Sequence, residues 1–154
     1  MLSFETTRVL KNLLETICET EMIIERQRQT LCENSKFAPY SAFCRIDRRA
    51  RECLEAPDIL AYLESNGSRK TIAECAKLVR YFDSDNDKLL SYADFIQIVL
   101  PCDNNDLRMA VQRRPYSRIG RFDTLDYDIE SGLSNIINHE LDLIYRSDML
   151  IREL

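Results

Sequence analysis

Residues 83–94 are the stretch that most constrains how this chain can fold. Aspartates stand at positions 1, 3, 5 and 12 of this twelve-residue segment, which lies between two amphipathic stretches. Oxygen atoms at alternate positions of such a loop can converge on one hard cation, with a position 7 carbonyl and a position 9 side chain completing the cage. The sequence therefore predicts a helix, an ion-binding loop and a second helix. The candidate metal ligands are Asp83, Asp85, Asp87, Leu89, Ser91 and Asp94.

The same framework recurs 36 residues earlier, at residues 47–58. Both segments begin and end with aspartate and have an apolar residue at position 8, Leu54 or Leu90. Arg49 and Arg51, however, stand at positions 3 and 5 of the earlier segment, where ligands would be needed. Two guanidinium groups repel a cation at such short range. We therefore expect the earlier segment to hold no metal and to serve the fold alone.

The two segments together resemble the EF-hand family, in which paired helix–loop–helix units join their loops as a short antiparallel ribbon. This resemblance covers residues 40–100 and implies a calmodulin-like or centrin-like module that binds calcium or derives from one that did. The arrangement of the whole chain is also similar to small EF-hand proteins of the protist cytoskeleton and axonemes. The resemblance implies an all-α fold, with an EF-hand pair flanked by long N-terminal and C-terminal amphipathic helices.

The second loop departs from the family pattern at two positions. Lys88 stands at position 6, where the family has glycine, and a non-glycine residue in the left-handed region costs about 1–2 kcal/mol. Asp94 replaces the usual glutamate at position 12 and reaches bidentate coordination less easily. We expect at most one weak site in the chain, binding Ca²⁺ at roughly 10⁻⁵ M or more weakly, with Mg²⁺ as the alternative ion.

The sequence divides into four parts. Residues 1–38 should contain one amphipathic helix, because residues 5–33 lack glycine and proline and repeat an apolar residue every seven positions. Residues 39–101 hold the EF-hand pair, and residues 102–125 hold a short helix and a basic connector. Residues 126–154 should form a final amphipathic helix. Either flanking helix could dock on the pair or on another protein.

The apolar face of the pair has two interpretations, a groove for a partner helix or plain hydrophobic core. Its residues are branched or aromatic and include none of the four methionines, which suits one fixed partner better than the many targets of a sensor. The residues of this face are Phe43, Leu60, Leu63, Leu78, Val79, Ile96 and Val99.

The basic connector is the second candidate surface. A strip of arginines on an acidic protein could hold an acidic surface such as the tubulin lattice, and a solvated linker is the alternative. The arginines concerned are Arg113, Arg114, Arg118 and Arg121.

Composition excludes several classes of function. The net charge of −5 argues against nucleic-acid binding, which needs an excess of Lys and Arg. No apolar run approaches the ~20 residues of a membrane span, and no C-x-x-C pair indicates zinc. His139 is the only histidine, and no phosphate loop or nucleophile motif accompanies it, so we expect no enzyme. We therefore expect a cytoplasmic protein, and the resemblance to small EF-hand proteins of the cytoskeleton and axonemes implies the cytoskeleton or a cilium as its place.

These observations favour a non-catalytic structural or adaptor component of a larger assembly, which binds a partner helix or a cytoskeletal filament. The alternative is a calcium-regulated sensor or switch of the calmodulin or centrin type.

Overall fold

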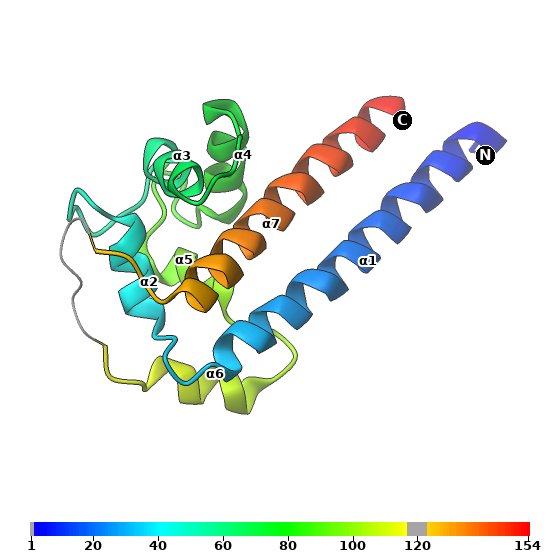
Figure 1. Cartoon of the computed structure of the whole chain (residues 1–154). Helices are drawn as coiled ribbons and strands as arrows, with labels where there is room; N and C mark the ends of the chain where they lie inside the picture. The colour runs from blue at the N-terminus through cyan, green and yellow to red at the C-terminus, as the bar shows by residue number, and fades with distance from the viewer. Residues whose placement is uncertain (1, 117–122) are drawn as a thin grey trace.

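The computed structural model describes residues 2–116 and 123–154, and within these ranges it contains seven α-helices and no β-strand (Figure 1). The all-α class predicted from the sequence is therefore confirmed. The helices are α1 (Phe4–Glu33), α2 (Pro39–Ile46), α3 (Ala56–Ser65), α4 (Ile72–Phe82), α5 (Tyr92–Val99), α6 (Asn105–Gln112) and α7 (Tyr127–Glu153). No helix in the described ranges is both long enough and apolar enough to cross a membrane.

The two long helices α1 and α7 lie side by side and run in opposite directions, so that both chain ends lie at one end of the pair (Figure 1). Ile24 and Leu31 of α1 and Leu133 and Ile137 of α7 are buried. Gly132 allows close approach, because a Cβ atom there would lie 3.2 Å from Leu31 Cδ1. The two flanking helices predicted from apolar periodicity are confirmed, and each packs mainly on the other.

Helices α2 to α5 form two helix–loop–helix units joined through their loops. Leu54 and Leu90 make one antiparallel bridge, in which each N–H donates to the other residue's carbonyl at 2.8 Å. The predicted pairing of the two loops at position 8 is therefore confirmed. The side chains of Thr71 and Ser91 begin α4 and α5 with capping boxes, which satisfy backbone N–H groups that the first helical turn leaves free.

Helix α7 also covers the paired units, since it packs against α3, α4 and α5. Most of the apolar face described from the sequence is consequently buried, and Leu60 and Ile96 are partly buried against it. Of its two interpretations, hydrophobic core is the one found in this structure. The residues that α7 adds to the core are Ile129, Leu133, Ile136, Ile137, Leu141 and Leu143.

A buried ionic contact fixes the first turn of α7. The Glu130 carboxylate accepts hydrogen bonds from Arg45 Nε at 2.6 Å, from Asn66 Nδ2 at 3.1 Å and from the Leu125 N–H at 2.8 Å. Burial by itself would raise the pKa of Glu130, but these donors outweigh it and leave the pKa below its ordinary value. The carboxylate therefore stays ionised and ties α7 to α2 and α3.

Arg28 makes the corresponding contact near the C-terminal end of α1. Its Nε donates to the Ile98 carbonyl of α5 at 2.7 Å, and its Nη2 donates to Glu140 of α7 at 2.7 Å. Burial raises the pKa of Glu140 to about 7, and the nearby Glu21 adds to this effect while Arg28 opposes it. Three helices thus meet at one guanidinium group.

The raised pKa of Glu140 predicts how stability depends on pH. Because the folded-state pKa lies above the ordinary value of 4.5, the free energy of unfolding should fall by up to about 3 kcal/mol as pH rises from about 4.5 to 8. Glu140→Gln should match the wild type near pH 4.5 and remove most of this decline, measured by urea unfolding across the range. His139→Asn, at the neighbouring position of the same helix, is the control. Parallel profiles for the wild type and Glu140→Gln would contradict the assignment.

Candidate metal loop and connector

The loop at residues 83–94 begins at the end of α4 and folds around its first aspartate. Asp83 accepts hydrogen bonds from the N–H of Asp85 at 3.1 Å and from the N–H of Lys88 at 2.7 Å. Asn86 and Lys88 have φ values of 57° and 65°, so position 6 takes the left-handed conformation expected of it without glycine. This backbone conformation turns the loop and aims its N–H groups at the Asp83 carboxylate.

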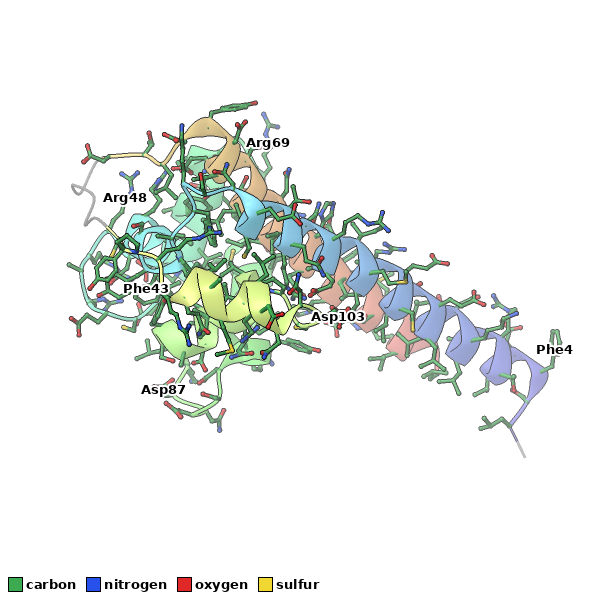
Figure 2. All side chains as sticks on the ribbon, turned by 90° about the horizontal axis from the view of Figure 1, so that it is seen from below. Phe4, Phe43, Arg48, Arg69, Asp87 and Asp103 are labelled. Atoms are coloured by element: carbon green, nitrogen blue, oxygen red, sulfur yellow. The ribbon has the colours of Figure 1, made fainter. Side chains whose placement is uncertain are left out.

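The electrostatics of Asp83 suit a cation ligand. Partial burial by itself would raise its pKa, but hydrogen bonds from the N–H groups of Lys88, Asp87 and Asp85, together with the Asp87 side chain, bring the pKa below its ordinary value. The side chain is therefore an anion at neutral pH. Figure 2 shows Asp87 at the outer end of the loop, where its carboxylate accepts the Leu89 N–H at 3.0 Å.

Asp94, the position 12 residue, is buried and has partners on both oxygens. Its Oδ1 accepts the Ser84 hydroxyl at 2.6 Å, and its Oδ2 accepts the Ser91 N–H at 3.2 Å. No group of three or more His, Cys, Asp or Glu side chains within the described ranges lies close enough together to hold a metal. The donor set fits a hard cation in its chemistry, but ion binding would require Asp94 to leave Ser84.

The loop at residues 47–58 has the same backbone framework, but the guanidinium group of Arg49 binds the carboxylate at its position 12, Asp58. Asp47 accepts the N–H groups of Arg51 and Glu52, and Glu52 at position 6 has a φ of 61°. Arg49 reaches across the loop, so that its Nε and Nη2 lie 2.9 and 2.8 Å from Oδ1 of Asp58. The position 12 carboxylate of this loop is thus already paired with a positive charge of the chain itself.

The connector differs from the outward-facing arginine strip expected from the sequence. Arg114 turns inward and donates to the carbonyl oxygens of Cys32, Asn34 and Phe37 at 2.7, 2.8 and 2.9 Å. The end of α1 leaves carbonyl groups without helical partners, and this guanidinium group satisfies them. Arg113 is exposed, whereas Arg118 and Arg121 lie outside the described residues.

The histidine has a side-chain partner, and two of the cysteines, Cys32 and Cys75, are buried. His139 Nδ1 lies 2.9 Å from Oε1 of Gln27, which joins α7 to α1. Burial raises the pKa of the Cys32 thiol to about 12 and that of Cys75 to about 11. Both thiols are therefore protonated and unreactive at neutral pH.

Sequence reasoning missed the parts played by Ser84, Arg49 and Arg114. A serine at position 2 and an arginine at position 3 carry no signal that names their partners, because each reaches a residue ten or nine positions away. The partners of Arg114 lie about 80 residues earlier in the chain. Only the fold brings these groups together.

Comparison with known proteins gives one partial similarity. Over 76 residues, the chain is 30% identical to the probable calcium-binding protein CML32 of Arabidopsis thaliana, covering 49% of this chain and 51% of that protein. The chain thus spans about half the length of this curated relative. No family model matches the sequence, and no solved structure matches it.

The Ser84 contact predicts a change in cation affinity. Ser84→Ala removes the hydrogen bond to Asp94 and should tighten divalent-cation binding at this loop on the order of 10-fold, because the carboxylate no longer has to give up a partner. Calorimetric titration with Ca²⁺ and Mg²⁺ measures this. Ser84→Thr keeps the hydroxyl and is the matched control. Equal affinity in Ser84→Ala and the wild type would show that this contact does not limit binding.

Proposed function

We propose that this chain is a non-catalytic EF-hand protein that acts as a structural or adaptor component, with one weak divalent-cation site at residues 83–94. The observation that carries the proposal is the Leu54–Leu90 bridge, which joins two loops of the same backbone framework between paired helices. The similarity to a probable calcium-binding protein over half of the chain supports it. His139 does not support a catalytic role, because its ring makes a hydrogen bond with the side chain of Gln27.

The first loop is proposed to keep its conformation without an ion. In an ion-binding loop the cation neutralises converging carboxylates. Here Arg49 pairs with Asp58 and Glu55, and Arg51 also pairs with Glu55. These side chains supply positive charge from within the loop. We infer that residues 47–58 serve as a permanent half of the pair and support the second loop through the Leu54–Leu90 bridge.

The position of α7 favours an adaptor over a sensor. A sensor of the calmodulin type exposes an apolar groove when calcium binds. In this chain α7 lies over α3, α4 and α5 and buries Leu133, Ile137 and Leu141. Opening such a groove would require α7 to leave, at the cost of these contacts and of the Arg45–Glu130 pair. We therefore propose that the pair stays closed and that partners bind elsewhere.

One observation favours the sensor as a second candidate. Asp94 is both the last candidate ligand of the loop and a member of the capping box that begins α5. Because α5 packs against α7, an ion that drew Asp94 away from Ser84 would act directly on a helix in contact with α7. A calcium-regulated switch would use this connection.

The partner is proposed to be a protein helix or a cytoskeletal filament such as the tubulin lattice, within a larger cytoskeletal or ciliary assembly. This proposal rests on the arrangement of the chain and on the basic connector. The net charge of −5 disfavours nucleic acid and anionic membranes as partners. Since Arg114 is occupied by α1, Arg113 is the connector arginine that remains exposed in the described ranges.

Cation titration tests the site. The wild type should bind one Ca²⁺ at roughly 10⁻⁵ M or more weakly, without an increase in exposed apolar surface measured by dye binding. Asp85→Asn, at an exposed ligand position, should weaken binding at least about 10-fold, because a charged ligand is lost. Glu52→Gln is the control, a neutralisation at an exposed position of the first loop. Submicromolar binding with new apolar exposure would contradict the adaptor and support the sensor.

Microtubule co-sedimentation tests the filament partner. The wild type should pellet with microtubules, and replacing Arg113, Arg118 and Arg121 by Glu should reduce pelleting several-fold through charge repulsion from the acidic surface. Arg114 stays native in this variant because α1 depends on it. Exposed Arg69→Glu, outside the connector, is the control for charge alone. Pelleting that is equal for all three proteins would remove the connector from the interaction.

A further inference from the structure

A small hollow lies beside the first loop, between the end of α2 and the first half of α3. Its volume is about 290 Å³, just below the range of about 300–1,000 Å³ that is typical of pockets for drug-sized ligands. The charged residues that line it are Arg45, Arg48, Arg49 and Asp58. Figure 2 shows Arg48 at the end of the molecule opposite to Phe4. The size and the charges of this hollow therefore suit a small anion better than a large organic ligand.

Arg45 is the buried arginine of this hollow, and one of its nitrogen atoms has no partner. Its Nε donates to Glu130 at 2.6 Å, and its Nη2 donates to Ser65 Oγ at 3.1 Å. Its Nη1 is buried and makes no hydrogen bond within the described ranges, and the residue as a whole is 2% exposed. A buried donor is nearly always paired in a folded protein, so an unpaired one in the wall of a hollow points to a ligand.

The fold holds the Arg45 guanidinium group in place before any ligand binds. The ring of Tyr62 lies under it, with Cζ 4.9 Å from the ring centroid, and Glu130 and Ser65 hold one edge. The guanidinium group is planar and its donors have fixed directions. Arg45 would therefore lose little conformational freedom when it binds an anion.

Arg48 supplies the unpaired positive charge of the hollow. Its side chain is half-buried and makes no ion pair within the described ranges, whereas Arg45 pairs with Glu130 and Arg49 pairs with Asp58. Burial brings the pKa of Arg48 below its ordinary value, and the positive charge of Arg45 lowers it further, while Glu130 opposes both effects. An anion between Arg45 and Arg48 would offset the repulsion of these two guanidinium groups.

Asp58 is the acidic residue in the lining of the hollow, and its charge is already balanced. Its Oδ1 accepts a hydrogen bond from Arg49 Nε at 2.9 Å, and its Oδ2 accepts the Glu55 N–H at 2.8 Å. Both oxygen atoms are thus engaged with groups of the first loop itself. The hollow is left with the positive charge of Arg48 in excess.

We propose that this hollow binds a small oxyanion of the phosphate type, held between the guanidinium groups of Arg45 and Arg48. Guanidinium donors match the oxygen atoms of a phosphate group in both charge and geometry. None of the residues that line the hollow belongs to the second loop, so the site does not depend on a cation at residues 83–94. The first loop, which has a cation-loop framework, would then lie beside a site for an ion of the opposite charge.

Titration of the full chain with inorganic phosphate, followed by the backbone amide signals in NMR spectra, tests the site. Ionic strength is held constant with sodium chloride, because salt screens exposed charges. The signals of residues 45–49 and 58–62 should shift and saturate with a Kd on the order of 1 mM, as two or three charge-assisted hydrogen bonds would give. Shifts that do not saturate by about 20 mM, or that lie elsewhere in the chain, overturn the proposal.

Replacing Arg48 tests the charge that the proposal depends on. Arg48→Gln should weaken phosphate binding at least about 10-fold, because it removes the unpaired guanidinium group and leaves Arg45 and its buried contacts intact. Arg51→Gln is the matched control, since Arg51 is exposed in the same loop and lies outside the lining of the hollow. Equal affinity in Arg48→Gln and the wild type would overturn the assignment.

A new carboxylate at the rim tests the place independently. Ala61 is exposed on α3 and lines the hollow, so Ala61→Glu should repel phosphate and weaken its binding at least about 10-fold. Ala73→Glu makes the same change at an exposed position of α4 outside the hollow and is the control. Circular dichroism of each variant checks that the helices are intact. Wild-type affinity in Ala61→Glu would overturn the location.

Two further ligands define the chemistry of the anion. Glycerol 3-phosphate that binds as tightly as inorganic phosphate would identify the phosphate group of an ester as the ligand, and binding of inorganic phosphate alone would identify the free ion. Both results agree with the proposal. Acetate presents one carboxylate with fewer oxygen atoms and should bind at least about 10-fold more weakly. Acetate that binds more tightly than phosphate would overturn the choice of phosphate.

Discussion

Arg28 joins three helices of this molecule, α1, α5 and α7. Its guanidinium group is buried between α1, α5 and α7, where it reaches the Ile98 carbonyl and the Glu140 carboxylate. The neighbouring Glu25 accepts the N–H groups of Cys102 and Asp103, which fixes the chain after α5. A buried ion pair adds little net stability, but losing one partner leaves an uncompensated charge. The contact therefore specifies where the long helices sit on the paired loops more than it strengthens them.

In both loops, other groups of the chain compensate the negative charge of the aspartates. A tight loop that gathers carboxylates needs a compensating charge or hydrogen-bond donors. The first loop uses the guanidinium of Arg49, and the second uses backbone N–H groups on Asp83 and the hydroxyl of Ser84 on Asp94. Both loops thus keep their shape and their shared bridge with internal partners. The aspartates of the second loop that an ion would meet, Asp83 and Asp94, therefore already have hydrogen-bond partners.

The helices and the pairing of the two loops were predictable from the sequence, and the side-chain contacts between distant segments were not. Apolar periodicity gave both long helices, and capping residues such as Thr71 and Ser91 gave helix starts, because these signals act within a few residues. The position 8 pairing followed from the repeat. The direction of Arg114 was predicted wrongly, since its charge indicated solvent while the unpaired carbonyls at the end of α1 were invisible in sequence. The spacing of the aspartates likewise did not show that Asp94 would accept a hydrogen bond from Ser84.

The distribution of apolar surface links these contacts to function. Helix α7 fills the position over α3, α4 and α5, so the surface that a sensor would open is covered by the chain's own helix. Near the chain ends, exposed apolar side chains remain on both long helices, among them Leu14 and Ile151. Helix α7 covers the paired units and also extends past them, together with α1, to the chain ends (Figure 1). The apolar face that a sensor would open is therefore hydrophobic core in this structure.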